Sequence, residues 1–388
     1  MSRISAIVLI AFLLSFVSGS SYGQNSEILI APNITLPKDT AITEIITSLN
    51  SLRGQIEGPN KQNKFILPAE RLTTYALVDE MKGMEQNAQL HDKKFYKPYL
   101  TNIVKQRDGY LVQIAYIGVT EGTPVIRASF KLIAKKQGGK ILFYSPLKQN
   151  TTGWKTKTLG NITFRFKDTL NTIDTKAFQK TVALYDKKLQ ANAPIIQYYC
   201  DNFAEAQQLL GVDYKADYAG VKDNNLTANE NGTSLIINGW GAEQHRFDPH
   251  DLFHDRLRTV LSPDVINRPV DEGAAYLYGG SWGFTWPQII TKFKTYVSQN
   301  PNADWLTLYS DGTNFNNEAK ILKISYVINA LIIQQLEKEK GFPAVMELLS
   351  CGKKEKGDEN YFKALAKLTG INKADFNVRV GGLIKAAK

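Results

Sequence analysis

Two histidines four residues apart place the strongest constraint on this chain. The segment 248–255 reads Asp-Pro-His-Asp-Leu-Phe-His-Asp and contains His250 and His254. On a helix, positions i and i+4 lie one turn apart on the same face. Two imidazoles in this arrangement can bind one metal ion, and a carboxylate from a following helix can supply a third ligand. Glu272, in the sequence Asp-Glu-Gly-Ala-Ala-Tyr at 271–276, is the candidate for that carboxylate.

The pattern H-D-x-x-H followed by E-G-x-A-x-Y resembles the gluzincin zinc metallopeptidases, the thermolysin-like and aminopeptidase-like group. Their motif is H-E-x-x-H, and a Glu on the next helix is the third zinc ligand. The resemblance implies that His250, His254 and Glu272 hold one zinc ion. It also implies that Asp251, which stands where the family has Glu, occupies the position of the general base.

Further site residues follow from the same resemblance. Gluzincins supply a Tyr or His that hydrogen-bonds the tetrahedral oxyanion, and Tyr326 and Tyr309 are the candidates here. Asp255 and Asp271 are candidates to orient a metal ligand. The alternatives are an exposed helix position for Asp255 and a helix N-cap for Asp271. His245 is an alternative ligand or a solvated loop residue.

The start of the histidine helix is also readable. Asp248 is a good N-cap residue, and Pro249 suits the first helical position. Asp251 then falls at the third position, where a carboxylate can reach back to the cap as in a capping box. Asp251 therefore has two interpretations, as a helix cap or as a general base.

The N-terminus predicts export. A basic residue precedes an apolar run at 7–14, and small residues follow, so residues 1–23 are interpreted as a secretory signal peptide. Residues 24–40 are polar and are interpreted as a tether. No other segment is long enough to cross a bilayer. The expected location is periplasmic or extracellular.

Composition narrows the classes of partner. The net charge is +10, but the lysines are scattered and no dense basic run occurs, so no nucleic-acid partner is expected. A solvated basic surface or attraction to an anionic cell surface remain the two interpretations of the charge. Cys200 and Cys351 are the two cysteines, and their apolar surroundings favour free thiols over a disulfide.

The chain is expected to form an α+β protein of two units. Residues 41–153 contain a helix and then strands with a two-residue period, which suggests a small α+β domain that loosely resembles the NTF2-like or cystatin-like folds. Residues 154–388 are expected to form a gluzincin-like domain with a mixed or antiparallel sheet, the zinc-helix pair and a C-terminal helical lobe. In the family, the strand just before the zinc helix, here 235–237, is the sheet edge along which a peptide pairs. A long buried helix is expected from Asn316 or Asn317 through Leu336.

Together these observations predict an exported, zinc-dependent, peptidase-like protein that hydrolyses peptide bonds with metal-activated water. One alternative is a catalytically inactive peptidase-like module that binds a peptide or a surface partner. The other is a structural protein in which the histidine pair is incidental. A peptide or protein is the expected partner in the first two cases, and the sequence leaves the oligomeric state open.

Overall fold

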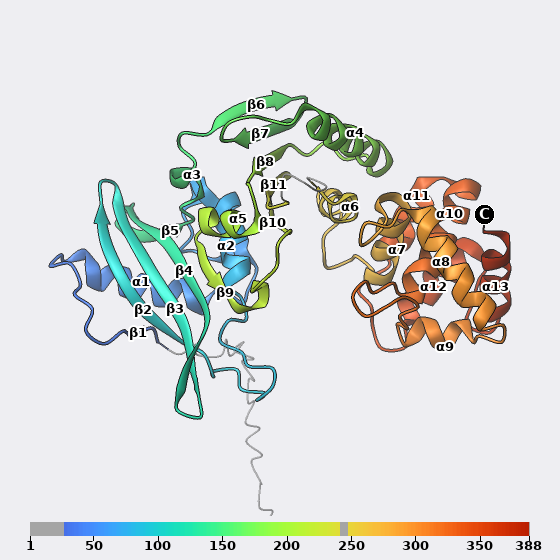
Figure 1. Ribbon diagram of the computed structural model, residues 1–388, viewed down its shortest axis with the longest axis horizontal. Coiled ribbons are helices and arrows are strands. Elements are labelled where there is room, and N and C mark those ends of the chain that lie inside the picture. The colour runs from blue at the N-terminus through green and yellow to red at the C-terminus, as the bar shows by residue number, and fades with distance from the viewer. Residues whose placement is uncertain (1–26, 241–246, 388) are drawn as a thin grey trace, which may run out of the picture.

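The computed structural model of the chain describes residues 27–240 and 247–387. The expected signal peptide and His245 lie outside the described residues. The described chain is a mixed helix and sheet protein, as expected for the α+β class. Figure 1 shows one sheet at one end, a second sheet in the middle and a group of helices at the other end.

The first sheet is an antiparallel meander with a short parallel strand at one edge. Its order is β1-β2-β3-β4-β5, and β9 also pairs with β4. Helices α1 (Ala41–Gly54) and α2 (Arg71–Met81) bury apolar residues against one face of this sheet. The strands are β1 (Leu29–Ile30), β2 (Lys97–Gln106), β3 (Gly109–Thr120), β4 (Thr123–Gln137), β5 (Lys140–Tyr144) and β9 (Val212–Lys215).

The first sheet also contains strands from outside the expected bounds of the first unit, residues 41–153. Strand β1 lies within the segment interpreted as a tether, and it pairs with Tyr99 and Leu100 of β2. Strand β9 comes from the expected second unit, and it pairs with β4. Ion pairs reinforce this contact: Lys131–Asp213 at 2.8 Å and Arg127–Asp217 at 2.6 Å. The two expected units therefore share a sheet.

The second sheet has the order β10-β11-β8-β7-β6. Its three inner strands are parallel, and both edge strands are antiparallel to their neighbours. The expected edge, 235–237, lies in β11, which is internal, so the edge next to the histidine helix is β10. An Asn231-Gly232 hairpin causes this difference, because it folds β10 back along the outer side of β11. The strands are β6 (Lys155–Leu159), β7 (Ile162–Phe166), β8 (Ile195–Tyr199), β10 (Asn225–Glu230) and β11 (Thr233–Asn238).

This second sheet separates two apolar cores. Successive side chains of a strand point to opposite faces. In β11, Ile236 faces the helical side, whereas Leu235 and Ile237 face the first sheet and its helices. In β8, Tyr199 faces the helical side and Tyr198 faces the first sheet and its helices. The sheet is therefore buried on both faces.

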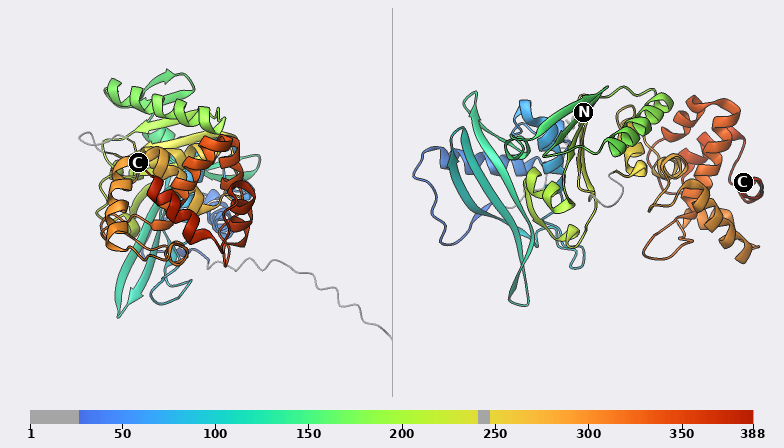
Figure 2. Two further views of the ribbon diagram at one scale, coloured as in Figure 1. Left: turned by 90° about the vertical axis from the view of Figure 1, so that its right-hand side faces the viewer. Right: turned by 45° about the horizontal axis from the view of Figure 1, so that its top comes forward.

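The remaining helices lie mostly on the far side of the second sheet, and the views in Figure 2 agree on this arrangement. The long buried helix expected from Asn316 or Asn317 begins instead at Ile324, because both asparagines form hydrogen bonds with Lys320 within a loop. The helices are α3 (Leu147–Asn150), α4 (Thr172–Leu189), α5 (Phe203–Leu210), α6 (Pro249–Leu257), α7 (Arg268–Gly279), α8 (Trp286–Gln299), α9 (Trp305–Ser310), α10 (Ile324–Lys340), α11 (Phe342–Leu349), α12 (Glu359–Thr369) and α13 (Phe376–Ala386), with single 3₁₀ turns at Asn60–Gln62, Pro68–Glu70 and Ala216–Tyr218.

The structure also bears on the two cysteines and on the expected absence of a further membrane span. Cys200 and Cys351 are free thiols, and Cys200 is buried. Burial raises the pKa of the Cys351 thiol to about 11, so it is a poor nucleophile at neutral pH. Across 27–240 and 247–387, no helix combines the length and the apolar character that a membrane span requires.

Candidate metal centre

Helix α6 begins as the sequence predicts. Asp248 is the N-cap residue, and its Oδ1 accepts a hydrogen bond of 2.9 Å from the backbone nitrogen of His250. Pro249 occupies the first helical position. His250 therefore lies in the first turn of α6, and His254 follows one turn later on the same face.

Helix α7 brings Glu272 to the two histidines. The C-terminal end of α7 lies directly against the start of α6, and a Cβ atom on Gly279 would lie 2.5 Å from the backbone nitrogen of His250. Glycine is therefore required for this close contact. Tyr185 of α4 holds the same junction, because its hydroxyl donates to the carbonyl oxygens of Pro249 and Tyr278, each at 3.1 Å.

The three candidate ligands meet at one point. The Nε2 atoms of His250 and His254 are 3.1 Å apart. Oε2 of Glu272 lies 3.4 Å from His250 Nε2 and 4.0 Å from His254 Nε2. Two ligand atoms bound to one zinc ion at about 2.0–2.1 Å in tetrahedral geometry are about 3.3 Å apart. The 3.1 and 3.4 Å spacings match this value and the 4.0 Å spacing is longer, so the three side chains form a cluster that could hold one metal ion.

Hydrogen bonds fix the orientation of both imidazoles. His250 Nδ1 lies 2.7 Å from the carbonyl oxygen of Gly280, which can only accept, so Nδ1 carries the proton. His254 Nδ1 lies 2.7 Å from Oδ1 of Asp271. Each Nε2 is then left with a lone pair that points toward the shared point. A carboxylate or carbonyl behind a histidine is the usual partner of a metal-binding imidazole.

The charges within the cluster favour a carboxylate at Glu272. Burial alone would raise the pKa of Glu272, but hydrogen bonding to His250 and the charges of both histidines bring it below its usual value. Burial lowers the pKa of His250, yet the hydrogen bond and charge of Glu272 outweigh this effect and leave it raised. Glu272 Oε1 also lies 3.5 Å from Nε of Arg268. The carboxylate is thus held in its ionised form, the form in which a carboxylate binds a metal ion.

Asp251 and Asp255 lie beside the ligand pair and one turn apart. With about 100° between successive residues, Asp251 is rotated about 100° from His250 and about 60° from His254. Asp251 is half-buried, and its carboxylate has no hydrogen-bond partner among residues 27–240 and 247–387. The N-cap bond comes from Asp248, so the capping interpretation of Asp251 gains no support from its contacts.

Asp255 is not the exposed residue that one interpretation expected, because it is buried. Burial raises the pKa of its carboxyl to about 7. Its carboxyl lies 3.5 Å from Arg258, and the side chain of Thr227 on the edge strand β10 is close enough to lower its pKa. The face of α6 that carries Asp251 and Asp255 is therefore turned toward β10.

The two tyrosine candidates lie in different surroundings. Tyr326, in the first turn of α10, packs edge-to-face on Tyr276 with 5.4 Å between ring centroids, and Tyr276 is 5.7 Å from the ring of His250. Burial, and then the charge of Glu272, raise the pKa of Tyr326. Tyr309 is instead buried in the helical core, stacked on Tyr361.

Several contacts of this centre were not predicted. Arg268 precedes Glu272 by one helical turn, so the i, i+4 rule could have found that pair. Tyr276 belongs to the E-G-x-A-x-Y pattern, but the pattern alone does not predict that its ring lies between His250 and Tyr326. The Gly280 carbonyl and the Tyr185 hydroxyl have no local sequence signal, because both depend on how α4, α6 and α7 pack together.

In comparisons with known proteins, the sequence matches no family model and no curated protein.

Proposed function

We propose that the chain is a zinc-dependent, peptidase-like protein in which His250, His254 and Glu272 hold one zinc ion. The observation that carries this proposal is the convergence of two Nε2 atoms and one carboxylate oxygen at 3.1–4.0 Å. The hydrogen bonds from His250 to Gly280 and from His254 to Asp271 support it, because they direct the Nε2 lone pairs toward the ion. The pattern also resembles the gluzincin motif.

In this proposal each residue has a distinct role. The zinc ion, when bound, polarises the scissile carbonyl and lowers the pKa of its water. The Asp251 carboxylate accepts a proton from the attacking water and delivers it to the leaving amine. The Tyr326 hydroxyl donates a hydrogen bond to the oxyanion that develops on the substrate. Asp271 holds the His254 ring in position.

We further infer that an extended peptide pairs with the edge strand β10. This strand pairs with β11 on one side, and no described strand pairs with its other side. The side chain of Thr227 lies close enough to Asp255 to affect its pKa, so a peptide along this edge passes close to the helix face that carries Asp251. From the basic residue, apolar run and small residues within 1–23, we also propose that the protein is exported to the periplasm or outside the cell.

The first test is the metal content of the mature chain, residues 24–388, beside a His254→Ala variant. We expect one zinc per chain in the first and none in the second. Metal removal by a chelator should lower Tm of the unaltered chain, because a ligand that binds only the folded state stabilises it. Absence of zinc from the unaltered chain after zinc is supplied would overturn the proposal.

A second candidate function is a peptide-binding module without catalysis, and the identity of Asp251 favours it. Asp has the acid-base chemistry of Glu but one methylene less reach, and a misplacement of about 1 Å can cost on the order of a hundredfold in rate. Peptide hydrolysis is measured for the zinc-loaded unaltered chain and for the zinc-loaded Asp251→Glu variant, to distinguish the enzyme from the binding module. Activity in either protein supports the enzyme, whereas zinc and peptide binding with no hydrolysis in both supports the module.

A further inference from the structure

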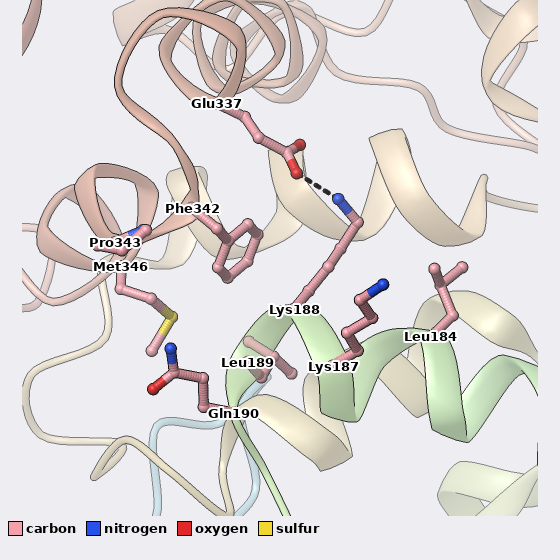
Figure 3. A pocket seen from close by; sticks show the side chains of 9 residues that line it. All are labelled: Leu184, Lys187, Lys188, Leu189, Gln190, Glu337, Phe342, Pro343 and Met346. Carbon is pink, nitrogen blue, oxygen red and sulfur yellow. Dashed lines mark hydrogen bonds and ion pairs between the residues drawn. The ribbon is translucent and has the colours of Figure 1, made fainter.

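A cavity with no role in the metal centre lies between the C-terminal end of α4 and the corner where α10 meets α11 (Figure 3). Its volume is about 590 Å³, within the range of about 300–1,000 Å³ that small-molecule sites occupy. None of the proposed metal ligands lines it. The lining residues are Leu184, Lys187, Lys188, Leu189, Gln190, Glu337, Phe342, Pro343 and Met346.

One side of the cavity is apolar. Leu189 is buried, Phe342 and Met346 are half-buried, and Leu184 lies at the rim with about half of its side chain exposed. Figure 3 shows the Phe342 ring and the Met346 side chain facing Leu189 across the space. Methionine adapts its shape to different apolar partners. This side of the cavity therefore suits a flexible hydrocarbon group.

The polar side of the cavity carries one uncompensated positive charge. Lys188 pairs with Oε1 of Glu337, and Oε2 of Glu337 accepts a 2.6 Å hydrogen bond from the hydroxyl of Tyr278. Lys188 also lies over the rings of Tyr278 and Phe342, at 4.5 and 5.5 Å from their centroids. Both oxygens of Glu337 are thus occupied, and Lys188 is held in place.

Lys187 supplies the free charge. It is exposed and has no acidic partner among residues 27–240 and 247–387. In Figure 3 its ammonium group lies between the side chains of Lys188 and Leu184. A cation beside an apolar wall matches a ligand that has an anionic head and an apolar body.

We propose that this cavity binds a single-chain amphiphile with a carboxylate head group, such as a fatty acid. The hydrocarbon chain lies along Leu189, Phe342 and Met346, and the carboxylate pairs with Lys187. The charge selects against a cationic amphiphile with the same chain. This site does not depend on zinc or on the proposed peptidase activity.

The test is calorimetric titration of the chain with dodecanoate below its micellar concentration. A carboxylate can also bind a metal ion, so the titration uses metal-free protein, and His254→Ala is titrated in parallel. We expect one dodecanoate per chain and the same affinity in His254→Ala. Lys187→Met should weaken binding about tenfold, as expected for the loss of an ion pair worth about 1.4 kcal/mol.

Lys180→Met is the matched control, because Lys180 is an exposed lysine of the same helix that does not line the cavity. It should leave the affinity unchanged, and dodecyltrimethylammonium should bind more weakly than dodecanoate. The circular dichroism spectrum of each variant checks its fold. The proposal is overturned by absence of dodecanoate binding at millimolar concentration, by equal losses in the two lysine variants, or by equal affinity for the two amphiphiles.

Discussion

At the scale of single residues, the candidate metal centre depends on side chains that are not themselves candidate ligands. His254 has one ring nitrogen directed at the shared point and the other 2.7 Å from Asp271. The carboxylate fixes both the rotation of the ring and the position of its proton. Without that contact, the imidazole is free to rotate or to protonate the nitrogen that the metal requires.

We therefore expect Asp271→Asn to weaken zinc affinity by roughly 10- to 100-fold, the usual effect of removing such a partner. The amide keeps the shape of the side chain but loses its charge. Zinc affinity is measured by competition with a chromogenic chelator. Asp264→Asn is the control, because Asp264 is an exposed aspartate whose partner is Lys353. Equal affinities in the two variants would show that Asp271 does not orient His254.

The sequence predicts the ligand residues but not the groups behind them. The spacing of His250, His254 and Glu272 uses helical geometry, which is local, and the structure brings these three residues together. The partner of His250 is a backbone carbonyl, that of Gly280. Because every residue has a backbone carbonyl, the sequence alone does not show which one lies beside the His250 ring in the folded chain.

At the scale of elements, α7 packs against α10 as closely as it packs against α6. A Cβ atom on Gly273 would lie 2.5 Å from Cβ of Asn329 and 2.9 Å from the backbone nitrogen of Ala330. Asn329 is fully buried and hydrogen-bonded to Tyr361, so it has little room to move. Any side chain at Gly273 pushes α7, and with it Glu272, away from α10.

Gly273→Ala should therefore destabilise the chain by about 1–3 kcal/mol, as expected for overpacking of a well-packed core. Thermal unfolding measures the effect. The matched control is Gly382→Ala on α13, where a Cβ atom meets nothing within 4 Å. There the helix propensity of alanine should stabilise the chain, by up to about 1 kcal/mol. A Gly273→Ala variant as stable as Gly382→Ala would contradict the close packing of α7 on α10.

Element boundaries were predicted where the signal is local. Asp248 and Pro249 start α6 as expected, and the helix from Asn202 to Gly211 would follow from the same rules. The edge strand was misplaced although its signal was present, because Asn231-Gly232 between two alternating stretches is a strong hairpin sequence. The pairing of β9 with β4 has no such signal, because it joins residues that are distant in the sequence.

At the scale of the whole molecule, the second sheet belongs to two cores at once. Its side toward the first sheet carries Tyr198, Leu226, Leu235 and Ile237, all nearly inaccessible to solvent. Burial of one such side chain contributes about 1.5–3 kcal/mol. Four of them amount to about 6–12 kcal/mol, which is comparable to the whole free energy of unfolding of a typical domain, about 5–15 kcal/mol. The sequence predicts that successive side chains of β8 and β11 point to opposite faces of the sheet. It does not predict which part of the chain covers each face.

Because this face contributes so much burial free energy, the part of the chain that begins at residue 154 should not fold on its own. A chain of residues 154–387 exposes that face of the sheet and deprives β9 of its partner strand. We expect it to aggregate or to unfold without a cooperative transition, whereas residues 24–388 should unfold cooperatively. Size-exclusion chromatography and thermal unfolding by circular dichroism make the comparison. A monomeric, cooperatively folded 154–387 chain would mean that the first sheet is an accessory to the metal centre. Aggregation or loss of the transition would mean that the first sheet and its helices are needed for the metal centre to fold at all.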